Sequence, residues 1–199
     1  SLLAALDAKP AYVAGHSAGA AILAEMCLAQ VLRPKVLISI NGALLPFRGK
    51  NRPLFSFLAK ALALNPLTPR LFAWQNGNGP AVARLMAQVG SNLDPQGLDY
   101  YRRLLARSGH VAAALNMMAN WNLEPLTARL PDLDLPVMLI AGARDGAVPA
   151  TETRRLQALL PNAELVMLEN VGHLAHEERP QEVAALIAQA AKQASSPAV

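Results

Sequence analysis

The chain has 199 residues, of which 53% are hydrophobic and 16% are charged, and its formal net charge is +4. This length allows one domain with a sizeable core, no apolar run approaches the 18 residues of a membrane-spanning helix, and the scattered basic residues argue against a nucleic-acid groove. Cys27 is the only cysteine, so no intrachain disulfide can form; with no recognisable signal peptide, we expect a cytoplasmic protein.

Four short apolar segments are expected to form strands, and helix-like stretches separate them. In chain order the strands are expected at Ala11–Gly15, Lys35–Asn41, Pro136–Gly142 and Ala163–Asn170. The middle two are nearly continuous apolar runs, which is typical of strands buried on both faces. Helices are expected at Ser17–Gln30, at Thr151–Leu160 with Thr151 as its N-cap, and at Glu182–Gln193. This alternation predicts βαβ units and a mostly parallel sheet, and therefore an α/β fold.

The alternation stops between the second and third strands, from residue 43 to residue 129. This stretch is rich in helix-forming residues and is broken by the segments NPLTP, NGNGP and SNLDPQG. Because structureless loops of this length are rare in compact domains, we expect a helical subdomain inserted between the two strands.

The junction of the first strand and the first helix carries the stretch GHSAG at residues 15–19, which matches the pattern G-x-S-x-G. A serine on such a turn is expected to have a strained backbone, and glycine at positions 15 and 19 is expected to avoid collisions with the turn. Ser17 would then stand at the carboxyl edge of the sheet, where open parallel sheets bind ligands. The Ala18 N–H is a candidate oxyanion donor. The competing interpretation is a glycine-rich turn that only packs.

A serine nucleophile needs a histidine base, and four histidines are available. His173 lies just past the fourth strand, where the loop returns over the carboxyl edge, and Gly172 before it allows a close backbone approach. We expect the His16 side chain to point away from the serine. His110 lies in the insertion and His176 in the next helical turn. We interpret these three as structural, while His173 is either the base or an ordinary loop residue.

The third partner is a carboxylate that orients the base. Asp145, in the loop after the third strand, is the best candidate, and Glu169 near the end of the fourth strand is the alternative. Asp132 and Asp134 precede their strand and belong at the opposite edge. The second strand ends at Asn41, which offers no carboxylate there. The competing interpretation of Asp145 is a residue that only solvates its loop.

The motifs GHSAG, GARDGAVP and GHLAHEERP, in this order, resemble the α/β-hydrolase superfamily. The resemblance implies an α/β-hydrolase fold and a serine hydrolase with catalytic Ser17, Asp145 and His173, an oxyanion donor at Ala18 and no cofactor. Such proteins usually have eight strands, so the first half of the sheet and a second oxyanion donor would lie outside this sequence. The implied division is a hydrolase core at residues 1–42 and 130–199, and a helical cap at residues 43–129.

Four longer stretches carry a narrower resemblance: VAGHSAGAAILAEM, SINGALLPF, NPLTPRLFAW and GHVAAALNMMANWNLEPL. They are similar to the magnesium-chelatase accessory proteins of bacteriochlorophyll biosynthesis. This implies a role in magnesium insertion into protoporphyrin, with chelatase subunits as partners and a small acyl or tetrapyrrole molecule as ligand. Two alternatives stay open: an unrelated carboxylesterase or C–C bond hydrolase, and a non-catalytic scaffold that binds a tetrapyrrole or a chelatase subunit.

The first part of the insertion mixes aromatic and basic residues in the stretch FRGKNRPLFSFLAKALALNPLTPRLFAW. An apolar lid with a basic fringe fits a flat tetrapyrrole with carboxylates, or peripheral contact with an anionic membrane surface. We favour the plainer interpretation, in which the cap packs its apolar side and leaves its charges in water. Met117, Met118 and Trp121 are interpreted as lid or pocket lining. No cysteine–histidine cluster suggests a metal site, and we predict none.

Overall fold

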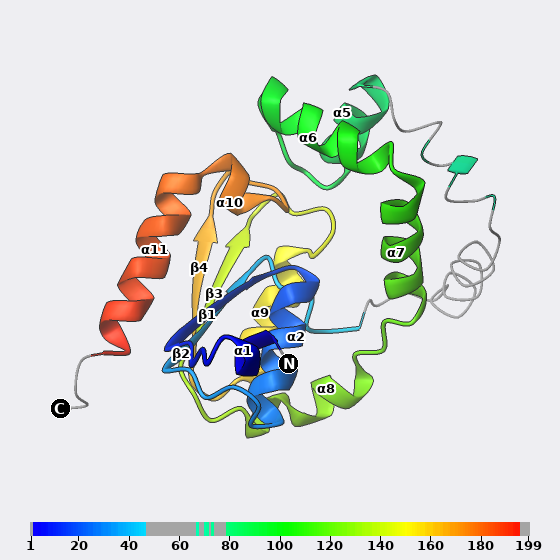
Figure 1. Cartoon of the computed structure of the whole chain (residues 1–199). Helices are drawn as coiled ribbons and strands as arrows, with labels where there is room; N and C mark the ends of the chain where they lie inside the picture. Colours follow the sequence, from blue (N-terminus) through cyan, green and yellow to red (C-terminus); the bar gives the residue numbers. More distant parts are fainter. Residues whose placement is uncertain (1, 47–66, 68–69, 72, 74–78, 196–199) are drawn as a thin grey trace. The chain divides into compact units, whose positions relative to one another are not determined.

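The computed structural model describes residues 2–46, 67, 70–71, 73 and 79–195 (Figure 1). The chain divides into two compact units. The first comprises Ser1–Leu45, Val89–Ser91 and Leu123–Val199, and the second comprises Pro46–Gln88 and Asn92–Asn122.

The first unit contains a four-stranded parallel sheet with the order β1-β2-β3-β4. The strands are β1 (Tyr12–His16), β2 (Val36–Ile40), β3 (Val137–Gly142) and β4 (Ala163–Leu168). The four predicted strands are confirmed, with ends that differ by up to two residues. Every residue of β2 and β3 is buried, as their continuous apolar sequences indicated.

Helices of this unit are α1 (Leu2–Ala5), α2 (Ala18–Leu28), α8 (Glu124–Arg129), α9 (Ala150–Leu159), α10 (Ala175–Glu178) and α11 (Pro180–Gln193), and a 3-10 turn spans Leu130–Asp132. The predicted helices are confirmed as α2, α9 and α11. The cap predicted for α9 is wrong, because Thr151 lies inside the helix with its side chain exposed. Pro149 holds the N-cap position, since its fixed φ of −55° already suits the approach to a helix.

Both faces of the sheet are covered, as a doubly buried parallel sheet requires. Helix α11 packs through Val183 and Ala190 against one face, where Ile38 and Ile140 belong to the same buried cluster. Helices α2 and α9 lie on the other side (Figure 1). This packing fixes the strands, so the loops that follow their carboxyl ends start from a rigid frame.

In the second unit the structure describes α5 (Gly79–Gln88), α6 (Pro95–Leu105) and α7 (Ser108–Ala119). Helix α6 begins after Asp94, whose carboxylate accepts the Gly97 N–H at 2.7 Å, and Pro95 follows at the first helical position. Met117 and Met118 on α7 are exposed. Most of the predicted aromatic and basic lid, including Phe47, Phe55, Phe57, Phe72, Trp74, Arg48, Lys50, Arg52 and Lys60, lies outside the described residues.

Among the residues that the structure describes, no helix is both long and apolar enough to span a bilayer.

Candidate active site

Ser17 stands on the sharp turn between β1 and α2. Its backbone has φ 51° and ψ −120°, a positive φ that is uncommon outside glycine. The turn is tied to the next strand, because the Ser17 N–H donates to the Ile40 carbonyl at 3.0 Å and the Ser17 carbonyl accepts the Ala43 N–H at 3.0 Å. The strained conformation predicted from the sequence is therefore present, and β2 holds it in place.

The two glycines around Ser17 differ in what they require. A Cβ at Gly15 would lie 2.6 Å from the backbone of Gly19 and Ala20, so only glycine fits there. A Cβ at Gly19 would meet no atom within 4 Å outside the backbone of its own helix. The prediction that both positions exclude a side chain is thus wrong for Gly19, which faces open space on the first turn of α2.

Three side chains that are far apart in sequence meet at the carboxyl edge of the sheet. His173 Nε2 lies 3.1 Å from Ser17 Oγ, and His173 Nδ1 lies 2.9 Å from Asp145 Oδ2. An ionised carboxylate can only accept, so Nδ1 carries the proton and donates to Asp145. In the neutral imidazole Nε2 is then an acceptor, and the Ser17 hydroxyl donates to it. This is the arrangement needed to remove a proton from a serine hydroxyl.

Asp145 is the most constrained of the three residues, with a side chain that is 1% exposed. Its Oδ1 accepts the backbone N–H groups of Ala147 and Val148, each at 2.8 Å, and its Oδ2 also accepts the Asn41 amide at 2.8 Å. Burial acts to raise its pKa, but the hydrogen bond from His173 and those from Val148 and Asn41 outweigh burial and hold the pKa below its usual range. The carboxylate is therefore ionised at neutral pH.

Asn41 follows β2 and was set aside in the sequence because it carries no carboxylate. It is 1% exposed and has a positive φ of 46°. Its amide nitrogen donates to Asp145 Oδ2 and, at 3.1 Å, to the Gly172 carbonyl. One side chain therefore holds both the carboxylate and the loop that carries His173. This contact depends on β2 and β3 being neighbours in the sheet. The local sequence SINGAL gives neither the order of the strands nor their register, so it could not predict the contact.

The His16 ring packs against the rings of both His173 and His176. The ring centroid of His16 is 4.7 Å from that of His173 and 4.4 Å from that of His176. His16 Nε2 donates to the backbone carbonyl of His173 at 2.9 Å, so the His16 ring is directed to the loop that carries the candidate base. Burial lowers the pKa of His16 from 6.5 to about 4, and burial also lowers the pKa of His176. Both rings are neutral at pH 7.

Among the described residues, the hydrogen bonds given for the Ser17, His173 and Asp145 side chains involve neither Glu169 nor His110. Glu169, the alternative acid, is exposed. His110 is exposed on α7 in the second unit. The Ala18 N–H opens α2, so it belongs to a first turn whose amides have no acceptor within the helix. That position suits an oxyanion donor beside Ser17.

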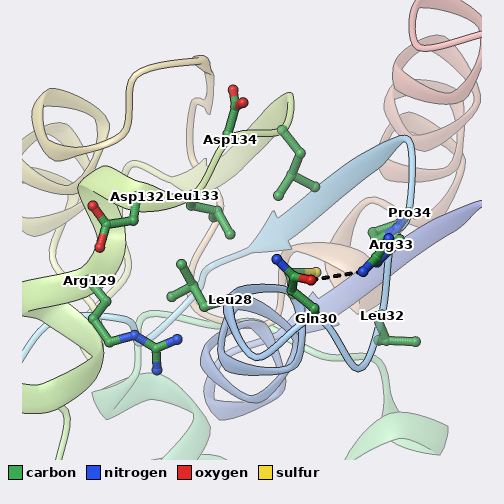
Figure 2. A pocket seen from close by; sticks show the side chains of 11 residues that line it. Leu28, Gln30, Leu32, Arg33, Pro34, Arg129, Asp132, Leu133 and Asp134 are labelled. Atoms are coloured by element: carbon green, nitrogen blue, oxygen red, sulfur yellow. Dashed lines mark hydrogen bonds between the residues drawn. The ribbon is translucent and has the colours of Figure 1, made fainter.

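A groove of about 560 Å³ lies at the opposite edge of the sheet. It is lined by the last residues of α2, by residues that follow α2 and by residues that precede β3 (Figure 2). Asp132 and Asp134 lie there, as expected from their place before the strand. Cys27 also lines this groove, and burial raises the pKa of its thiol, which favours the protonated form at neutral pH. Within the described ranges, no group of three or more histidine, cysteine, aspartate or glutamate side chains is arranged to hold a metal ion.

Comparison with known proteins gives a consistent fold. A family model described as "Alpha/beta hydrolase family" matches residues 1–186. The magnesium-chelatase 30 kDa subunit of Rhodobacter capsulatus is 39% identical over 172 residues, which are 86% of this chain and 60% of that protein. A putative carbamate hydrolase of Pseudomonas syringae is 27% identical over 193 residues, covering 90% of this chain and 67% of the relative.

Among solved structures, an alpha/beta hydrolase fold protein from Burkholderia ambifaria superposes with a TM-score of 0.76 at 20% identity. The match covers 94% of this chain and 68% of that chain. At this identity the likeness speaks for the fold alone. The chain spans about 60% of the length of the Rhodobacter capsulatus relative.

Proposed function

The chain belongs to the alpha/beta hydrolase family, and on that premise we propose that it is a serine hydrolase whose nucleophile is the Ser17 hydroxyl. One observation carries this proposal: Ser17 Oγ lies 3.1 Å from His173 Nε2, while His173 Nδ1 lies 2.9 Å from the buried carboxylate of Asp145. The roles follow from which atoms can give or take a proton. His173 is the general base, and Asp145 orients its ring and stabilises the imidazolium that forms.

In the first step Ser17 Oγ attacks the carbonyl carbon of an acyl substrate and passes its proton to His173 Nε2. The new C–O bond pushes the carbonyl electron pair onto oxygen, and the Ala18 N–H donates to this oxyanion. The oxyanion then collapses, the bond to the leaving group breaks, and His173 Nε2 returns the proton to that group. A water then gives a proton to the same nitrogen and attacks the acyl carbon. The bond from that carbon to Ser17 Oγ breaks, Oγ takes the proton back from His173 Nε2, and the acid is released.

We further propose that this activity serves magnesium insertion into protoporphyrin. The support is the 39% identity to a protein named as a magnesium-chelatase subunit. The ligand would be a small acyl compound or a tetrapyrrole, the partners would be chelatase subunits, and the place of action would be the cytoplasm. The second candidate function is a scaffold that binds a ligand or a partner without catalysing a reaction. The name of the Rhodobacter capsulatus relative supports it equally, because a subunit of an enzyme need not itself be catalytic.

Hydrolysis of p-nitrophenyl acetate tests the chemistry without the natural substrate. We expect Ser17→Ala to lower kcat by about 10⁴-fold or more, as removal of a nucleophile does in serine hydrolases. The matched control is Ser108→Ala, at the start of α7 in the second unit, which should keep the wild-type rate. A rate that is the same in wild type and Ser17→Ala would contradict the proposed hydrolase.

Genetic complementation separates the two candidate functions. A phototrophic strain that lacks the gene is supplied with the wild type, with Ser17→Ala or with Ser108→Ala, and bacteriochlorophyll is measured. We expect Ser17→Ala to fail and Ser108→Ala to restore pigment. Full rescue by Ser17→Ala, with equal protein levels, would favour the scaffold.

A further inference from the structure

The three residues Val89–Ser91 join α5 to α6, yet they belong to the compact unit that contains the sheet. The residues on either side of them, up to Gln88 and from Asn92, belong to the other unit. Ser91 is 5% exposed. We call this segment the Val89–Ser91 strap. Its hydrogen bonds to the loops that carry Asp145 and His173 explain why it belongs to the unit that contains the sheet.

The carbonyl of Val89 joins two of these loops through a single oxygen. It accepts the Gly146 N–H at 3.2 Å and the His173 N–H at 3.1 Å. A carbonyl oxygen has two lone pairs, and here each is directed to a different loop. Gly146 directly follows Asp145, and the other donor is the amide of the candidate base itself. The strap therefore sets the spacing between the loop of the acid and the loop of the base.

Ser91 adds a third bond at the other end of the strap. Its Oγ accepts the Leu174 N–H at 2.9 Å, one residue beyond His173. The backbone of His173 is thus held from several sides. Its N–H donates to Val89, the next N–H donates to Ser91, and its carbonyl accepts the His16 ring nitrogen at 2.9 Å. Only the imidazole remains to face Ser17 and Asp145.

Two glycines make this close approach feasible. Gly90 has φ +78°, and a Cβ there would lie 1.9 Å from the Arg144 carbonyl oxygen. A Cβ at Gly172 would lie 2.3 Å from the carbonyl carbon and oxygen of Gly90. At Gly90 the strap is in backbone-to-backbone contact with both loops. Any residue other than glycine at position 90 must displace the strap or the Asp145 loop.

We propose that the Val89–Ser91 strap is a positioning element that holds the His173 and Asp145 loops in register, so that the imidazole stays within hydrogen-bonding distance of Ser17 Oγ. The strap touches no reacting atom and acts through the loops. The effect of the strap on catalysis rests on the proposed function. The effect of the strap on the geometry of the His173–Asp145 pair is independent of that function. The experiment therefore has one readout for each.

Two variants disturb the strap, and a third variant is a matched control. Gly90→Ala forces a Cβ against Arg144, whereas Ser91→Ala removes only the acceptor of the Leu174 N–H. Gly109→Ala is the control, because a Cβ at Gly109 on α7 meets no atom within 4 Å outside its own helix backbone. Circular dichroism establishes that each variant is folded. Should Gly90→Ala fail to fold, Ser91→Ala decides the matter.

The geometric readout is the proton NMR resonance of the His173 Nδ1–H, which a hydrogen bond to a carboxylate moves far downfield; its absence in Asp145→Asn assigns it. We expect this resonance to broaden or vanish in Gly90→Ala, to weaken in Ser91→Ala and to persist in Gly109→Ala. The amides of Gly146, His173 and Leu174 should exchange faster with solvent in the two strap variants. An unchanged resonance and unchanged exchange in both would overturn the proposal.

The kinetic readout is the rate of inactivation by a fluorophosphonate probe, together with kcat and KM for p-nitrophenyl acetate. We expect a loss in kcat of about 100-fold for Gly90→Ala, the effect of a misplacement near 1 Å, and of about fivefold for Ser91→Ala, with KM unchanged. Wild-type kinetics in both variants would overturn the positioning role. If the wild type reacts with neither reagent, the proposed hydrolase activity is refuted. The NMR readout then still tests whether the strap positions the His173 and Asp145 loops.

Discussion

The buried His16 ring makes a quantitative prediction about acid stability. Burial lowers its pKa from 6.5 to about 4 in the folded protein, whereas in the unfolded chain the ring titrates at its ordinary value. Between pH 6.5 and about pH 4 the His16 ring is protonated in the unfolded state and neutral in the folded state. The free energy of unfolding must therefore fall as the pH falls through this range. Of the interval from pH 7 to pH 5, about 1.5 pH units lie below 6.5. At about 1.4 kcal/mol per pH unit, the free energy of unfolding falls by about 2 kcal/mol. Partial solvent access to the ring reduces this to about 1–2 kcal/mol.

Urea unfolding at pH 7 and at pH 5, at one ionic strength, measures this difference. We expect wild type to lose about 1–2 kcal/mol more over this interval than His16→Gln, because glutamine at position 16 does not titrate. His110→Gln is the control that removes one exposed histidine. The low pKa of Asp145 does not enter this window, because its stabilising effect is present above its ordinary value of 3.8 and is lost only below it. The same pH dependence in wild type and His16→Gln would refute the reasoning.

Further substitutions test the frame around the candidate site. Asn41→Ala removes the amide that holds Asp145 and Gly172, and we expect about a tenfold loss of kcat for p-nitrophenyl acetate with the protein still folded; full activity would contradict the role of Asn41. Asn41→Asp places a second carboxylate near Asp145, which raises the pKa of that pair, so the acid limb of the pH–rate profile should move to higher pH. Gly15→Ala should destabilise by about 1–3 kcal/mol in urea unfolding, because its Cβ would lie 2.6 Å from backbone atoms. Gly19→Ala should be neutral or slightly stabilising, and a large loss there would show that the elbow is packed differently.

Much of the fold could be predicted from the sequence, because its signals are local. Continuous apolar runs mark β2 and β3, and the structure buries every residue of both. The chain order of GHSAG, Asp145 and His173 was sufficient to nominate the three side chains that meet at the carboxyl edge. The carboxyl ends of parallel strands lie at one edge of the sheet. A residue that directly follows any of these strands can therefore be placed at that edge from the sequence alone.

The residues that support this cluster could not be predicted, because their contacts depend on tertiary structure. Asn41 was noted only for lacking a carboxylate, although its amide reaches Asp145 from the neighbouring strand. Val89 acts through its main-chain carbonyl, which every residue has, so no sequence pattern reveals it. Gly172 was the single hint of a close approach, and the approaching backbone is that of Gly90.

The central claim is that Ser17 is a nucleophile made reactive by His173 and Asp145. The most direct test treats the protein with a fluorophosphonate and locates the adduct by peptide mass spectrometry. We predict one phosphonyl group on Ser17, with a labelling rate that falls by about 10³-fold or more in His173→Gln. No adduct on Ser17, or an adduct that forms equally fast in His173→Gln, would contradict the account.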